Sequence, residues 1–366
     1  MDSLKVKNIE IFRYRLPLHW QLPVFGKMIE TRSGYLIKIS NDSGEFGYGE
    51  IAPLPRLHDE NLEMAFEQLK YLQHELSDKI LPENLEQLNS GFENWFSDFR
   101  LFPSVRFGIE TAILNLLAKS RKISLASLLS SNYQKRVKVN GLVNNENSEI
   151  ISQVSTLLAD GFTTIKMKVG RKSVNEDIEL VRRANKYYVG KIKLRLDANR
   201  SWTFDDAMMF SNTVNKSIIE YIEEPLQENK FLEKFHHATG IPVALDESLS
   251  EISAAELKQF GYATALVLKP SVIGGFEKCV RFIREGKILG IYPVLSCAFQ
   301  SGLGLAAIVN FAASLNPGNT AMGFDTMKWF KKDVLLEPAR ANNGEIDVDE
   351  VYYRGIVIDK NMIKAF

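Results

Sequence analysis

The sequence has few cysteines and histidines, the residues that cross-link small secreted domains or bind zinc. It contains only two cysteines in 366 residues, Cys279 and Cys297, too few for a disulfide framework or a cysteine-based zinc site. It contains five histidines, and none of them follows one of the buried strands expected below. This scarcity weakens any mechanism that uses a histidine base or a histidine-bound zinc ion.

Net charge and long apolar runs are also absent. Lys and Arg total 45 and Asp and Glu total 45, whereas a nucleic-acid or anionic-membrane partner would favour a basic surface. No apolar run approaches the roughly 20 residues needed to cross a bilayer. The first sixteen residues are charged and alternating, without the apolar core of a signal peptide. We therefore expect a cytoplasmic protein that binds neither nucleic acid nor membrane.

The N-terminal hundred residues have the pattern of a small α+β unit. Residues 5–16 and 35–40 alternate apolar and polar side chains, which predicts antiparallel strands, and residues 59–75 and 84–97 show helical spacing. The last forty residues contain two strand-like segments, 346–348 and 355–358, which we expect to form a hairpin that returns to this unit.

A different alternation begins near residue 104. Apolar, β-branched segments alternate there with amphipathic stretches, whose candidate N-caps are Asn147, Ser173, Thr203 and Ser250. The strand-like segments are 137–143, 163–169, 192–197, 218–223, 242–246, 265–269, 292–296 and 321–325. Eight such segments predict a parallel sheet closed into a barrel. An open doubly wound sheet would show the same alternation, but no GxGxxG follows the first segment.

Two lysines lie at the end of the second strand, and a third follows the sixth strand. Lys166 and Lys168 are two residues apart, so their side chains point to one face. Two close cations lower each other's pKa, which can turn a lysine into a base near pH 7. The alternative is a solvated strand end with both lysines in water. Lys269 approaches from the opposite side of the barrel mouth.

Three consecutive strands end in a carboxylate, namely Asp197, Glu223 and Asp246. Each of these alone could be a helix cap or a first-turn acid. Three carboxylates at one level repel each other unless they bind a cation, and Mg²⁺ prefers such oxygen ligands. We therefore expect a divalent-metal enzyme in which a lysine removes a proton next to a substrate carboxylate.

These residues together resemble the enolase superfamily, in its muconate-lactonising-enzyme subgroup. The motifs that carry the resemblance are K-x-K at 166–168, D-A-N at 197–199, E-E-P at 223–225, D-E-S at 246–248 and the lone Lys269. The resemblance covers essentially the whole chain. It implies an α/β fold: a modified TIM barrel, (β/α)7β, over residues 104–326, with an α+β capping domain from residues 1–103. Residues 327–366 would form a C-terminal segment that returns to the capping domain.

Within this subgroup the sequence is most similar to the o-succinylbenzoate synthase family. The similarity lies in the Glu50–Pro55 loop, Asn140-Gly141, the Ser301–Gly304 segment and the Gly323–Thr326 segment. It implies a carbon–oxygen lyase (hydro-lyase) of menaquinone biosynthesis. Such an enzyme dehydrates a small carboxylate, 2-succinyl-6-hydroxy-2,4-cyclohexadiene-1-carboxylate, to 2-succinylbenzoate.

The same resemblance implies a role for each site residue. Asp197, Glu223 and Asp246 would bind Mg²⁺, for which Mn²⁺ could substitute. Lys168 would abstract the α proton and assist loss of hydroxide, Lys269 would stabilise the enolate across the ring, and Lys166 would tune Lys168. The expected substrate or supporting residues are Asn199, Arg195, Asn140, Ser296, Gly323 and Asp325. Arg195 could instead form a structural ion pair. The sequence departs from many relatives at Gln300, Cys297 and Ala298, where they carry a glutamate and two serines.

Two alternative functions remain open. A dipeptide epimerase or N-acylamino-acid racemase would use the same lysines and metal site. Dipeptide epimerases resemble one another in an Asp-x-Asp at the eighth strand, and Gly323-Phe324-Asp325 keeps only the second aspartate. A non-catalytic barrel that acts as a binding protein predicts loss of some of the charged positions, yet all are present.

Overall fold

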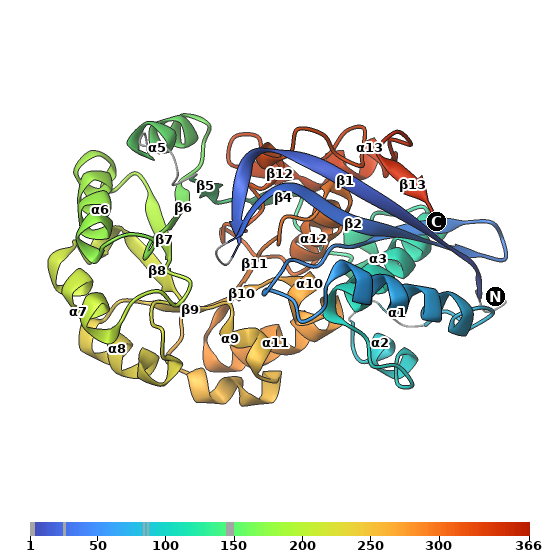
Figure 1. Cartoon of the computed structure of the whole chain (residues 1–366), viewed down its shortest axis with the longest axis horizontal. Helices are drawn as coiled ribbons and strands as arrows, with labels where there is room; N and C mark the ends of the chain where they lie inside the picture. Colours follow the sequence, from blue (N-terminus) through green and yellow to red (C-terminus); the bar gives the residue numbers. More distant parts are fainter. Residues whose placement is uncertain (1–3, 25–26, 83–84, 86–87, 144–149) are drawn as a thin grey trace.

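The computed structural model describes residues 4–24, 27–82, 85, 88–143 and 150–366, and Figure 1 shows their arrangement. The strands are β1 (Val6–Val24), β2 (Lys27–Asn41), β3 (Phe46–Ile51), β4 (Arg136–Lys138), β5 (Gly141–Leu142), β6 (Thr164–Lys168), β7 (Lys193–Asp197), β8 (Ile219–Glu223), β9 (Val243–Leu245), β10 (Ala265–Leu268), β11 (Tyr292–Leu295), β12 (Glu345–Asp347) and β13 (Ile363–Ala365). The α-helices are α1 (Leu62–Glu75), α2 (Gly91–Trp95), α3 (Pro103–Ser120), α4 (Leu125–Leu129), α5 (Ile150–Ala159), α6 (Val174–Tyr188), α7 (Phe204–Thr213), α8 (Leu232–Thr239), α9 (Ser248–Glu251), α10 (Pro270–Ile273), α11 (Phe276–Leu289), α12 (Gly302–Ser314) and α13 (Val348–Arg354).

The N-terminal region forms an antiparallel sheet in the order β13-β1-β2-β3. The strands predicted over residues 5–16 and 35–40 are confirmed as parts of β1 and β2, and the helix predicted over 59–75 is confirmed as α1. The helix predicted over 84–97 is wrong except for α2, although residues 84, 86 and 87 lie outside the described ranges. Leu88 and Ser90 have φ angles of 46° and 66°, a left-handed backbone that an α-helix does not contain.

Seven parallel strands form the barrel sheet, in the order β11-β10-β9-β8-β7-β6-β5. Figure 1 shows helices α5 to α8, green to yellow, on the outside of these strands. The eighth expected strand, 321–325, is reduced to two bridging residues. Met322 pairs with Val139 and Gly323 pairs with Ser296, both in parallel. These bridges join the two edges of the sheet, so the predicted barrel is confirmed with a short eighth segment.

The ends of the barrel region differ from the predictions. The first expected strand, 137–143, is divided, because β4 pairs with β12 and only β5 pairs with β6. The hairpin expected from 346–348 and 355–358 is wrong, since helix α13 follows β12 directly. The C-terminal residues reach the N-terminal sheet through β13, which pairs antiparallel with β1. The expected domain boundaries stay a prediction.

Side-chain caps lie at the N-termini of several barrel helices. Ser173 forms a capping box with Glu176 at α6, and Thr203 accepts the backbone N–H of Asp206 at α7, as predicted. Ser250 is not a cap, because it lies inside the short helix α9. The fourth candidate, Asn147, lies outside the described residues.

Two further expectations concern membranes and cysteines. In the described part of the chain, no helix is long and apolar enough to span a bilayer. Cys279 and Cys297 are both buried and carry free thiols.

A buried carboxylate joins the N-terminal sheet to the barrel. Glu50, in β3, accepts hydrogen bonds from the backbone N–H groups of Ser301 (2.9 Å) and Gly304 (3.0 Å) in the first turn of α12, and from the hydroxyl of Tyr14. A Cβ atom on residue 304 would meet Glu50 Oε2 at 2.3 Å, so this approach requires glycine. An acid from one unit thus caps a helix of the other.

We expect Glu50→Ala to lower the free energy of unfolding by about 3 kcal/mol, because it leaves buried donors without an acceptor. The measurement is denaturant or thermal unfolding followed by circular dichroism. Glu63→Ala, which removes an exposed first-turn acid of α1, should cost less than about 1 kcal/mol. Equal losses of stability in the two variants would contradict the role of Glu50 as a cap of α12.

Candidate active site

Strand register places the expected charged residues at one end of the barrel. Lys168 of β6 lies opposite Asp197 of β7, and Asp197 lies opposite Glu223 of β8. Asp246 directly follows β9, and Lys269 directly follows β10. The three carboxylate residues are only 2%, 1% and 6% exposed, in chain order. Parallel strands therefore bring these acids together at the C-terminal mouth of the barrel, where barrel enzymes carry their sites.

The lysines and the carboxylates form one network of ion pairs. Lys166 Nζ lies 2.9 Å from Asp197 Oδ2 and 2.7 Å from Glu223 Oε2. Lys168 Nζ lies 2.7 Å from the same oxygen of Asp197. Lys269 pairs with Asp246. Each acid is thus neutralised by at least one ammonium group.

The charges of this network set the pKa of its members. Burial lowers the pKa of Lys166, but the carboxylates of Asp197 and Glu223 outweigh burial and hold that pKa well above its usual value. In this network the carboxylates, and not the neighbouring lysine, therefore decide the pKa of Lys166. Burial raises the pKa of Asp197, but Lys166 and Lys168 hold it well below its usual range.

Asp246 behaves in the opposite way. Burial raises its pKa, and the attraction of Lys269 does not offset burial together with the neighbouring carboxylates of Glu247 and Glu223. The third acid of the site therefore lies in a cluster of negative charge.

The acids fit a divalent cation by their chemistry. In the described ranges, no three acidic, histidine or cysteine side chains are arranged as a ready metal site. Instead, lysine ammonium groups lie between the carboxylates, and Lys166 contacts both Asp197 and Glu223. Three buried carboxylates that need cations as neighbours form a donor set that suits a hard ion such as Mg²⁺.

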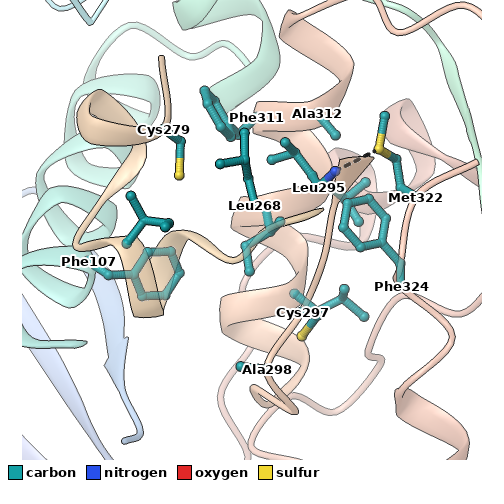
Figure 2. Close-up of a cluster of buried hydrophobic side chains, with 14 of the residues drawn as sticks. Phe107, Leu268, Cys279, Leu295, Cys297, Ala298, Phe311, Ala312, Met322 and Phe324 are labelled. Atoms are coloured by element: carbon teal, nitrogen blue, oxygen red, sulfur yellow. Dashed lines mark hydrogen bonds between the residues drawn. The ribbon is translucent and has the colours of Figure 1, made fainter. Parts of the chain in front are cut away.

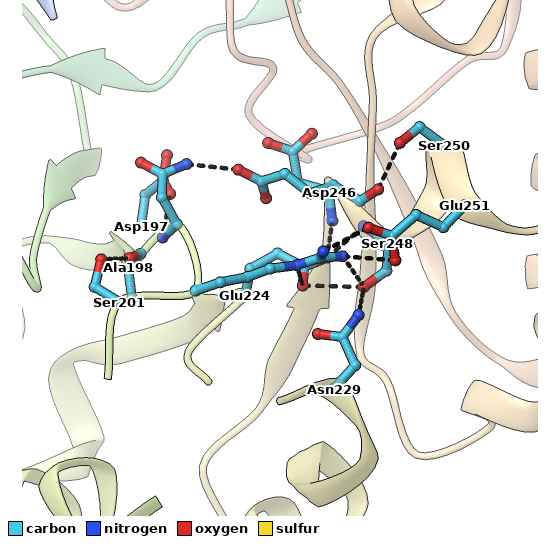
Figure 3. A network of polar contacts seen from close by, with 12 residues as sticks. Asp197, Ala198, Ser201, Glu224, Asn229, Asp246, Ser248, Ser250 and Glu251 are labelled. Atoms are coloured by element: carbon cyan, nitrogen blue, oxygen red, sulfur yellow. Dashed lines mark hydrogen bonds and ion pairs between the residues drawn. The ribbon is translucent and has the colours of Figure 1, made fainter. Parts of the chain in front are cut away.

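A second acid in E-E-P, Glu224, holds the backbone at Asp246 (Figure 3). Glu224 accepts the N–H groups of Asp246 and Ser248, both at 2.9 Å, and the hydroxyl of Ser248 at 3.0 Å. Arg200 Nε donates at 3.1 Å to Glu224 Oε2, the oxygen that also accepts the Ser248 hydroxyl. Glu224, Arg200 and the neighbouring Asn199 have φ angles of 42°, 58° and 44°. Such left-handed, non-glycine residues gather at functional sites.

Asn199 links one lysine to a further acid. Its Oδ1 accepts a hydrogen bond from Lys168 Nζ, and its Nδ2 donates to Glu247 Oε1 at 2.7 Å. The second oxygen of Glu247 is buried without a partner in the described part of the chain. Asn199, predicted as a supporting residue, therefore holds Lys168 in position.

A cavity of about 410 Å³ lies over this network. Its polar wall includes Lys166, Lys168, Asp197, Asn199, Glu247, Lys269 and Arg171. Its apolar wall includes Leu22, Val24, Leu54 and Leu57 from the N-terminal unit, with Phe299 from the loop after β11 and Trp329 from the segment after the eighth barrel strand. The site is therefore built by both units: the barrel contributes the charged side chains, and both contribute hydrocarbon.

Four of the expected supporting residues also line the cavity: Asn140, Ser296, Gly323 and Asp325. Asp325 is already engaged, because its Oδ2 accepts the backbone N–H of Leu142 at 2.9 Å and pairs with Lys328. Burial raises the pKa of Asp325. This acid therefore joins the two edges of the barrel, and its charge is balanced within the protein.

Arg195 forms a structural ion pair below the site. Its guanidinium donates to Glu220 at 2.9 and 3.1 Å and to the carbonyl of Ala321 at 2.6 Å. The β7–β8 register shifts between Leu194 and Arg195, so no β7 residue lies opposite Glu220 in the strand pairing. This irregularity leaves the Glu220 side chain free to pair with Arg195. Burial lowers the pKa of Arg195, but Tyr221 and Glu220 outweigh burial, so the pKa lies above its usual value. Of the two roles left open, the geometry supports the structural one.

Of the three positions expected to depart from relatives, Cys297 and Ala298 line the cavity, whereas Gln300 lies behind its wall. Figure 2 shows Cys297 and Ala298 just past Leu295, beside the core that contains Phe324. The thiol of Cys297 contacts Gln300 Oε1 at 3.1 Å, and Gln300 Nε2 donates to Ser271 Oγ at 2.7 Å. Gln300 is thus buried in a neutral network and does not line the cavity.

Sequence reasoning missed several contributors to the site. Glu224 and Glu247 stand inside the motifs E-E-P and D-E-S, so their position next to an expected metal ligand was a usable signal. Arg171 lies three residues past Lys168, beyond a glycine that ends the strand. The apolar wall had no local signal, because it depends on how the N-terminal unit meets the barrel.

Curated relatives match nearly the full length of the chain. It is 31% identical to o-succinylbenzoate synthase of Aliivibrio salmonicida, over 89% of this chain and 92% of that protein. It is 29% identical to the enzyme of the same name from Pasteurella multocida, over 97% and 99%. It is also 34% identical to the chloroplastic protein PHYLLO of Arabidopsis thaliana, over 91% of this chain but only 22% of that longer protein.

Solved structures share the fold. Muconate lactonizing enzyme from Pseudomonas fluorescens matches with a TM-score of 0.86 at 18% identity, over 99% of this chain and 100% of that one. A dipeptide epimerase from Enterococcus faecalis, complexed with Mg and the dipeptide L-Leu-L-Tyr, matches with a TM-score of 0.83 at 20% identity, over 98% and 99%. At these identities the likeness shows the fold alone.

Two family models match the chain. Residues 149–361 match the model described as "Enolase C-terminal domain-like", and residues 6–116 match "MenC, N-terminal domain". Together with the curated relatives, these matches confirm the resemblance seen in the motifs. The chain belongs to the enolase superfamily and, within it, to the o-succinylbenzoate synthase family.

Proposed function

We propose that this chain is an o-succinylbenzoate synthase, a hydro-lyase that converts 2-succinyl-6-hydroxy-2,4-cyclohexadiene-1-carboxylate to 2-succinylbenzoate and water. One observation carries the proposal: Lys168 and Lys269 line the same cavity, each next to a buried acid of the Asp197, Glu223 and Asp246 set. Full-length relatives of that name support it.

The acids Asp197, Glu223 and Asp246 would hold Mg²⁺, which supplies fixed positive charge beside the substrate carboxylate. A divalent cation suits their donor set, and Mg is present in the dipeptide epimerase complex of the same fold. Mn²⁺, with the same preference for oxygen ligands, could replace it.

Lys168 would carry both proton transfers. Its amine takes the proton from the ring carbon that bears the carboxylate, which leaves an enolate. The new ammonium group then gives that proton to the departing hydroxyl group on the same face, so water leaves and the ring becomes aromatic. Asn199 holds Lys168 in position through its side-chain oxygen.

Lys269 would stabilise the enolate. It pairs with Asp246 and follows β10, which three strands separate from the β6 strand of Lys168 in the barrel sheet. A fixed ammonium group beside the ring favours the developing negative charge, both directly and by cation–π contact.

The cavity also bears on the epimerase alternative. A dipeptide carries an ammonium group, which needs a carboxylate partner. The cavity-lining acids outside the expected metal set are Glu247 and Asp325. Asp325 is balanced by Lys328, and Glu247 is bonded to Asn199. Asp325 is therefore not a free partner for a substrate ammonium group, and Glu247 keeps only its buried Oε2, which has no partner in the described part of the chain.

The test is a direct assay with the cyclohexadiene substrate beside panels of dipeptides and N-succinylamino acids. We expect kcat/KM for the dehydration to exceed that for dipeptide epimerisation by at least about 100-fold. Deuterium incorporation from D₂O reports proton abstraction from the amino-acid substrates. Efficient exchange in dipeptides without dehydration of the cyclohexadiene would reject the proposal in favour of an epimerase.

A further inference from the structure

Four cationic side chains line the cavity, and three of them are already paired with acids. Lys166, Lys168 and Lys269 contact the expected metal ligands. Arg171, the fourth, makes no ion pair or hydrogen bond with any residue that the structure describes, and its side chain is exposed. A cation that faces a binding cavity without an internal partner is placed to meet an anionic ligand.

The backbone before Arg171 is firmly held. Gly170 has a φ angle of 74°, and its N–H donates to Asp177 Oδ2 at 2.9 Å. The same carboxylate accepts the indole N–H of Trp202 at 3.1 Å. A Cβ atom on Gly170 would meet Ser201 Cβ at 2.5 Å, so the turn depends on glycine. Arg171 therefore extends from a fixed point at the cavity mouth.

The substrate of the proposed reaction is a dianion. Its ring carboxylate belongs beside the acids and lysines that stabilise the enolate, while its succinyl chain ends in a second carboxylate. The remaining charged groups of the cavity wall, Glu247 and Asp325, are acids and would repel that carboxylate. A guanidinium can bind it through two parallel N–H···O bonds.

We propose that Arg171 binds the terminal carboxylate of the succinyl chain and so selects for a dianionic substrate. This inference rests on the proposed function, because it takes the succinyl substrate as given. It makes Arg171 a specificity residue that contacts the substrate away from the reacting atoms.

The test compares two ligands on matched variants. In Mg²⁺-containing buffer, Arg171→Met should raise the KM of the cyclohexadiene substrate, and the Kd of 2-succinylbenzoate measured by calorimetry, by about 10- to 100-fold. Since the proposed contact is with the succinyl carboxylate and not with the reacting atoms, kcat should change by less than about 3-fold. The amide analogue, in which –CONH₂ replaces the succinyl carboxylate, should bind the variant and the unsubstituted protein equally. Arg171→Lys, which keeps the charge but loses the bidentate geometry, should give intermediate values.

Lys172→Met is the matched control. Lys172 is the next residue, pairs with Glu176 at 3.5 Å, and does not line the cavity, so both ligands should bind as before. Unchanged affinity for 2-succinylbenzoate in Arg171→Met overturns the inference, and so does equal weakening of both ligands. If the unsubstituted protein neither turns over the substrate nor binds 2-succinylbenzoate, the proposed function itself fails, which is a separate outcome.

Discussion

Replacing Lys168 with alanine is expected to lower kcat by at least about 10³-fold, because no other group of the site would take the proton. The fold should survive the change. The Lys168 side chain is 25% exposed, and its partner Asp197 keeps a second ion pair to Lys166 at 2.9 Å. The buried charge of Asp197 therefore stays compensated, and the midpoint of thermal unfolding should move by only a few degrees.

Two companion variants make this result specific. Lys168→Arg keeps the positive charge but cannot give up a proton near neutral pH, so it should be as inactive as the alanine variant. Lys172→Ala removes the charge of a nearby lysine outside the cavity and should retain full activity. Turnover of more than a tenth of the normal rate in either Lys168 variant would refute its assignment as the base.

Chelation of divalent metal by EDTA is expected to lower activity by more than about 100-fold, and Mg²⁺ or Mn²⁺ should restore it. The structure supplies a physical reason. Without a competing cation, Asp197 holds Lys168 and Asp246 holds Lys269 in ion pairs. Both lysines are then engaged by the protein's own acids and are not free to act on the substrate.

Metal binding can also be tested at a single expected ligand, Asp246. Asp246→Asn should weaken Mg²⁺ binding by about 10-fold or more in calorimetry, because it removes a charged oxygen donor from the set. Asp205→Asn, in the exposed first turn of α7 and away from the cavity, should bind Mg²⁺ normally. Full activity in EDTA, or equal affinity in both variants, would contradict the assignment of the three acids as the metal site.

The sequence itself determined the barrel and the chemistry at its mouth. Apolar periodicity marks buried strands, and parallel strands bring their carboxyl ends to one edge. Charges at those ends therefore had to meet, which is why Lys168, Asp197 and Glu223 could be placed at one level before any coordinates. The same local logic predicted the caps at Ser173 and Thr203.

Only the tertiary structure decided how distant segments meet. Arg195 takes Glu220 as its partner because the β7–β8 register slips by one residue. Glu50 caps α12 from 251 residues away, and Arg171 faces the cavity because a glycine turn directs the chain there. Periodicity records which side of an element is buried, but not which element lies opposite. Pairings across long sequence separations, including the short eighth barrel segment and the C-terminal strand β13, therefore have no local signature.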